Sequence, residues 1–100
     1  MFDDIQALLD DAGGGDINRI ERTLTDGYAK ALSLEAERWR LEKQIGEVAG
    51  SIARGEEAKK ARELSLLAKQ LEASDGDLTR LRGLLASLRA RREVVRAAAV

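Results

Sequence analysis

Residues 64–95 read LSLLAKQLEASDGDLTRLRGLLASLRARREVV, and leucine recurs among them at alternating steps of three and four. This spacing places the apolar side chains along one face of an α-helix and is the heptad pattern of a coiled coil. The full series is Leu64, Leu67, Leu71, Ser74, Leu78, Leu81, Leu85, Leu88, Arg92, Val95 and Ala99. We therefore predict one long helix with a single apolar seam.

A second series with the same spacing precedes it. It consists of Ile17, Ile20, Leu24, Gly27, Ala31, Leu34, Arg38, Leu41, Ile45, Val48 and Ile52. Asp16 stands just before this series, where its side chain can cap a helix N-terminus. The chain has no proline to interrupt a helix and few residues that favour strands. Together the two series predict an all-α fold with two long helices.

Gly55 marks the turn between the two helices, because glycine readily takes the left-handed conformation that ends a helix. Glu56 and Glu57 follow it and suit the start of a second helix. We predict a long antiparallel coiled-coil helical hairpin over 16–100, with arms 16–54 and 56–98. With the turn centred near residue 56, facing residues have numbers that sum to about 112, and each d position of one arm meets an a position of the other. Gly27 thus faces Leu85.

Arg38 and Ser74 face each other under the same alignment. A polar layer in a coiled-coil seam lowers stability but can fix the register, so we assign these two residues that role. Ser74-Asp75-Gly76-Asp77 also resembles the start of a new helix, and a third helix could begin there. The spacing from Leu71 to Leu78 keeps the heptad phase, however, which favours one continuous helix.

Residues 1–12 predict a short amphipathic helix, since Phe2, Ile5, Leu8 and Leu9 share one face. Gly13-Gly14-Gly15 ends it and forms a linker over 13–15. This helix could dock on the hairpin, exchange with a second copy or bind a partner. The sequence leaves the choice open.

The chain contains no histidine and no cysteine, which excludes thiolate and histidine metal sites and nucleophile–histidine pairs. One acidic group, Glu35, Glu37, Asp75 and Asp77, surrounds Arg38 in the predicted hairpin. These carboxylates could hold a divalent cation or supply an acid and a base. Solvated charges balanced by nearby arginines are the simpler interpretation. We predict no enzyme, no catalytic residue, no metal and no cofactor.

Charge is unevenly distributed, although the net charge is −1. Residues 1–50 carry −5 and residues 51–100 carry +4. The basic run near the C-terminus, Arg89, Arg91, Arg92 and Arg96, could contact phosphates. No aromatic side chain is interleaved to stack on bases, so cations that complement the helix dipole and the acidic arm are favoured over nucleic-acid binding.

Six apolar residues lie outside the two seams and are candidate contacts with a protein partner: Phe2, Ile5, Leu9, Tyr28, Leu32 and Trp39. Tyr28 and Trp39 could instead pack under the N-terminal helix or inside a homodimer. We expect a non-enzymatic oligomerisation or adaptor module that forms a homodimer, is cytoplasmic and has no membrane segment. The alternatives are a chaperone-like or secreted helical hairpin that covers a partner helix, and a nucleic-acid-associated coiled coil.

Overall fold

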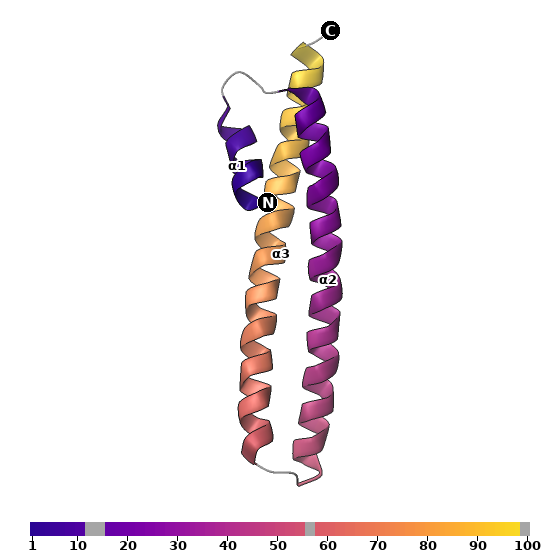
Figure 1. Cartoon of the computed structure of the whole chain (residues 1–100), viewed down its shortest axis with the longest axis vertical. Helices are drawn as coiled ribbons and strands as arrows, with labels where there is room; N and C mark the ends of the chain where they lie inside the picture. The colour runs from indigo at the N-terminus through magenta and orange to yellow at the C-terminus, as the bar shows by residue number, and fades with distance from the viewer. Residues whose placement is uncertain (12–15, 56–57, 99–100) are drawn as a thin grey trace. The chain divides into compact units, whose positions relative to one another are not determined.

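The computed structural model of the chain describes residues 1–11, 16–55 and 58–98. Within these ranges it contains three α-helices and no strand. They are α1 (Phe2–Asp10), α2 (Ile17–Ala53) and α3 (Ala58–Ala98) (Figure 1). The all-α class predicted from the sequence is confirmed. The residues form two compact units: unit 1 contains 1–32 and 79–100, and unit 2 contains 33–78.

Unit 1 packs three helical segments together: α1, the first part of α2 and the last part of α3. The α2 and α3 segments run antiparallel, because Gly27 meets Leu85 whereas Glu21, earlier on α2, meets Arg96, later on α3. Helix α1 lies alongside α3 and runs parallel to it (Figure 1). The buried apolar side chains of the unit are Ile5, Leu8, Ile20, Leu24, Ala31, Leu81, Leu85 and Leu88.

Gly27 of α2 lies in close contact with Leu85 of α3 in unit 1. A Cβ atom placed on Gly27 would overlap Cδ2 of Leu85 and lie 3.4 Å from its Cγ. Leu85 is itself buried, so its side chain occupies the space that a larger residue at position 27 would need. The predicted pairing of Gly27 with Leu85 is therefore confirmed.

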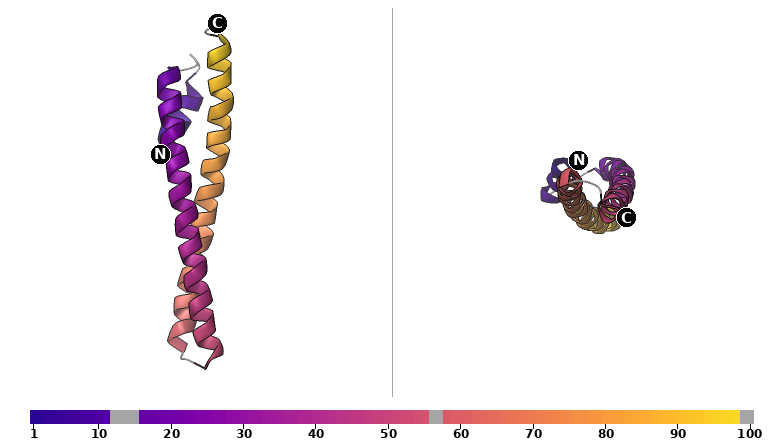
Figure 2. Two further views of the ribbon diagram at one scale, coloured as in Figure 1. Left: turned by 90° about the vertical axis from the view of Figure 1, so that its right-hand side faces the viewer. Right: turned by 90° about the horizontal axis from the view of Figure 1, so that it is seen from below.

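Unit 2 packs the end of α2 against the start of α3 (Figure 2). Its buried residues are Leu34, Leu41, Val48, Ser74 and Leu78. Half-buried seam positions continue the same two faces: Ile45, Ile52, Leu64, Leu67 and Leu71. The predicted seam positions are thus the ones that this unit removes from solvent. Their burial is the main stabilising term, because apolar surface leaves water there.

Two helix ends have the predicted chemistry. The backbone N–H of Asn18 donates to Oδ1 of Asp16 at 3.0 Å, so Asp16 caps the start of α2. After α2, Gly55 has a φ of 86°, and its N–H donates to the carbonyl of Ile52 at 2.9 Å. The helix limits differ by one or two residues from the predicted arms. Gly13–Gly15, Glu56, Glu57 and Ala99 lie outside the described residues.

Helix α3 runs without interruption through 74–77. The alternative prediction, a new helix that begins at Ser74, is therefore wrong. Gly76 has open space around it and costs only helix propensity, roughly 1 kcal/mol relative to alanine. Burial of Leu78 on the seam offsets this cost, because it removes an apolar side chain from water.

Substituting Gly27→Ala should destabilise the protein. Alanine gains about 1 kcal/mol of helix propensity, but overpacking a filled core costs typically 1–3 kcal/mol, and the buried Leu85 has to move. We expect a net loss of up to about 2 kcal/mol in the free energy of unfolding. Denaturant unfolding followed by circular dichroism at fixed protein concentration measures it.

Gly83→Ala is the matched control, since Gly83 is an exposed helical glycine of the same unit and a methyl group at this position would have nothing within 4 Å. It should stabilise by about 0.5–1 kcal/mol. In a Leu85→Ala background, Gly27→Ala should become stabilising as well. Equal gains from Gly27→Ala and Gly83→Ala in the natural background would contradict the close packing.

Candidate functional site

Helix α1 is bound to the C-terminal part of α3 within unit 1. Ile5 and Leu8 are buried, while Phe2 and Leu9 are half-buried. Nine residues are too few for a helix to be stable alone, since isolated helices need about 12–15 residues. The structure therefore shows α1 docked on its own chain, which was one of the three possibilities that the sequence left open.

Two arginines of α3 hold the two ends of α1. The guanidinium of Arg80 lies 4.6 Å from the centroid of the Phe2 ring, within cation–π range. At the other end, Arg91 donates to the carbonyl of Leu9 at 2.8 Å and to that of Asp11 at 3.2 Å. The last carbonyls of a helix lack partners within it, so Arg91 satisfies the end of α1. We call the face of α3 from Arg80 to Arg91 the α1 seat.

Sequence reasoning misses the seat, because it groups Arg91 with possible phosphate contacts and gives Arg80 no such role. A signal is nevertheless present in the charges. Residues 1–11 carry four aspartates and no basic side chain, whereas residues 79–98 carry six arginines and one glutamate. Opposite charge points to contact between the two segments.

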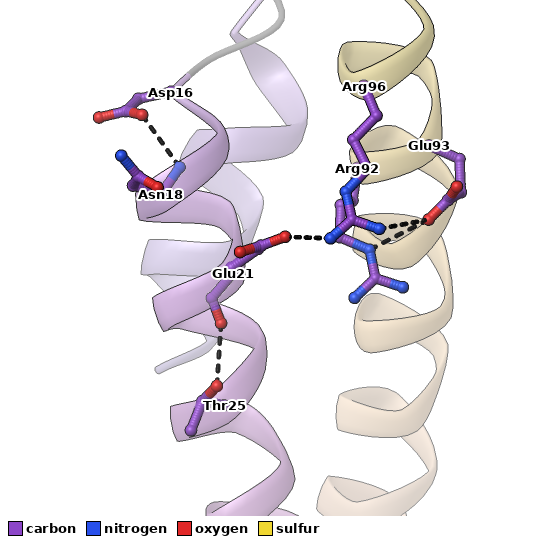
Figure 3. A network of polar contacts seen from close by, with 7 residues as sticks. All are labelled: Asp16, Asn18, Glu21, Thr25, Arg92, Glu93 and Arg96. Atoms are coloured by element: carbon purple, nitrogen blue, oxygen red, sulfur yellow. Dashed lines mark hydrogen bonds and ion pairs between the residues drawn. The ribbon is translucent and has the colours of Figure 1, made fainter.

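The other C-terminal arginines also have partners in unit 1. Arg96 pairs with Glu21 of α2 and lies 3.7 Å from Glu93, and Arg92 lies 3.2 Å from Glu93 (Figure 3). The guanidinium of Arg89 lies 6.0 Å from the Tyr28 ring centroid. Together with Arg91 at the end of α1, all four arginines predicted as possible phosphate contacts therefore have partners within unit 1.

Helix α2 leaves large apolar side chains in solvent. In unit 1, Tyr28 is 39% exposed and Leu32 is 67% exposed. In unit 2, Trp39 is 63% exposed, and Nζ of Lys43 lies 5.5 Å from its ring centroid. The Tyr28 ring lies near the guanidinium of Arg89 on α3.

The predicted layer of Arg38 and Ser74 is only partly as expected. Ser74 is buried at its seam position, and within the described part of the chain its hydroxyl has no hydrogen-bond partner. Nε of Arg38 turns outward to Oδ1 of Asp75 at 3.0 Å and Oε1 of Glu42 at 3.2 Å. A guanidinium is costly to bury, so its long side chain carries the charge to the rim of the seam.

The acidic group around Arg38 does not assemble into a metal site. No group of three or more carboxylates that could hold a metal ion occurs in the ranges that the structure describes. Asp75 contacts Arg38, and Glu35 has an interaction of its own. Among the described residues, these carboxylates therefore do not gather into a group of three or more.

Comparisons with protein-family models, with curated proteins and with solved structures found no match for this chain. Among the described helices, none has a stretch both long and apolar enough to cross a membrane. The surface features of the chain that bear on binding are the α1 seat and the exposed side chains of α2.

Replacing Ser74 with alanine should stabilise the protein. The change removes a buried hydroxyl without a partner, which costs about 1–3 kcal/mol, and improves helix propensity. Ser65→Ala is the control, because Ser65 is exposed on the same helix in the same unit. Thermal or denaturant unfolding should show a gain about 1 kcal/mol larger at position 74 than at position 65. Equal gains would indicate that the Ser74 hydroxyl is satisfied.

Arg91→Gln should loosen α1 selectively, because it removes the two hydrogen bonds to the end of that helix. A hydrogen bond from a charged donor contributes roughly 1.5–3 kcal/mol, and partial exposure reduces this to about 1 kcal/mol. Amide hydrogen exchange over residues 5–10 should therefore accelerate about fivefold. Arg22→Gln, an exposed arginine of α2 in the same unit, should leave exchange in α1 unchanged. Equal effects of both substitutions would rule out the role given to Arg91.

Proposed function

We propose that this protein is a non-enzymatic antiparallel coiled-coil hairpin that binds protein through its helix faces, with a second copy of the chain as its first partner. The proposal includes both the coiled-coil geometry and self-association into a helical bundle. Antiparallel packing of α2 and α3 supports the first. The second is supported by apolar surface that the single chain leaves uncovered.

The observation that carries the proposal is the exposure of Trp39 on α2. A tryptophan in solvent exposes a large apolar ring, and aromatic side chains dominate the binding energy of protein interfaces. Exposure of Tyr28 and Leu32 on the same helix supports the same conclusion. In each unit, α2 thus exposes apolar side chains to solvent, whereas the seam residues are packed between α2 and α3.

The chemistry of the chain supports binding rather than catalysis. No histidine or cysteine is present to act as a nucleophile or as a proton carrier near neutral pH. The arginines that could have contacted phosphates are engaged by Tyr28, Glu21, Glu93 and the end of α1. A protein partner therefore fits the free surface better than a nucleic acid.

Trp39→Ala tests the proposal by sedimentation equilibrium. Loss of an interface hot spot costs about 2 kcal/mol or more, so the dissociation constant of the dimer should rise roughly 30-fold. Leu66→Ala is the matched control, because Leu66 lies on α3 of the same unit and is 61% exposed, against 63% for Trp39. It should change the dissociation constant by less than about threefold, within the roughly ±0.5 kcal/mol typical of surface changes.

Unfolding of both variants should match the natural protein at concentrations where it is monomeric, since neither side chain is buried. A natural chain that stays monomeric at several hundred micromolar would contradict self-association. So would a Leu66→Ala variant that dissociates as readily as Trp39→Ala.

A further inference from the structure

The spacing of Arg80 and Arg91 along α3 is close to the length of α1. Arg80 and Arg91 are eleven residues apart on α3, a rise of about 16 Å, and α1 spans about 14 Å from Phe2 to Asp11 at roughly 1.5 Å per residue. The two arginines therefore meet the aromatic start and the carbonyl end of the same short helix. Between them, Ile5 and Leu8 supply the buried apolar contacts.

The seat also selects its ligand by charge. Asp3, Asp4, Asp10 and Asp11 give the segment 1–11 an acidic character, and the α3 segment that receives it is rich in arginine. Opposite charge steers the two segments together and disfavours a neutral or basic helix in the same place. The ligand that fits is a short, acidic, amphipathic helix with an aromatic residue at its start.

We propose that α1 is exchanged between copies, so that α1 of one copy occupies the α1 seat of a second copy. Every copy carries both the seat and the segment that fits it, and an exchanged α1 makes the same contacts as the docked one. Exchange of an identical element is for this reason a low-cost route to a dimer. This inference rests on the proposed function, since copies already joined through α2 hold α1 and seat at high local concentration.

Two full-length variants test the exchange by complementation. The first, Ile5→Asp with Leu8→Asp, disables α1 and leaves its seat open. The second, Arg80→Glu with Arg91→Glu, disables the seat and leaves α1 intact. The second variant is isotope-labelled and is mixed with an excess of the unlabelled first variant. Amide exchange over residues 5–10 of the labelled chain should slow at least about tenfold, because its α1 then docks on the open seat of the other copy.

A chain that carries all four substitutions is the matched control, because it offers no usable seat and should give no protection. Absence of protection with the first variant, or equal protection with the control, would overturn the exchange. Circular dichroism checks that the α2–α3 packing survives in each variant. If the first variant loses its helical spectrum, Ile5→Ser replaces it, since this smaller change introduces no charge and keeps Leu8.

The readout separates this inference from the proposed function. Exchange protection in α1 reports only on the seat, whereas the dissociation constant of Trp39→Ala reports on the exposed face of α2. If Trp39→Ala weakens the dimer but mixing the variants gives α1 no protection from amide exchange, the exchange of α1 alone would be overturned. Self-association that Trp39→Ala leaves unchanged, together with α1 protection on mixing, would overturn the proposed α2 interface alone. A natural chain that stays monomeric would overturn both, because exchange itself joins two copies.

Discussion

Burial of two apolar series, one on α2 and one on α3, is the constraint on which the other features depend. The residues at steps of three and four along each helix are those removed from solvent in both units. In unit 1, Gly27 and Leu85 interlock so closely that a one-residue slip would place a side chain where there is no room. The helices are long and largely solvated, so this narrow seam provides most of the stabilisation.

The sequence predicted the helices well because their pattern is local and repeated. The heptad phase alone indicated that α3 continues through 74–77, and single residues, Asp16 and Gly55, marked where α2 starts and ends. The seat of α1 could not be predicted in the same way. An amphipathic helix reveals which of its faces is apolar but not which surface will cover it, and Arg80 and Arg91 look like ordinary solvated arginines in the sequence.

The polar layer shows a second limit of sequence reasoning. Spacing placed Ser74 in the seam correctly, but spacing does not say where a long flexible side chain such as that of Arg38 ends. The guanidinium of Arg38 reaches Asp75 and Glu42 at the rim, and the short Ser74 side chain stays behind in the core. At the surface, the aspartates of α1 and the arginines of α3 carry opposite charges, which favours contact between these two segments.

Nuclear Overhauser contacts of Leu85 test the central claim most directly, namely that the two apolar series face each other with Gly27 opposite Leu85. The methyl groups of Leu85 should show strong contacts with the Hα protons of Gly27. In a sample mixed from labelled and unlabelled chains, those contacts should arise within one chain. Contacts from Leu85 to Ile20 or Leu34 instead, one heptad away, would contradict the register, and contacts found only between chains would contradict the fold.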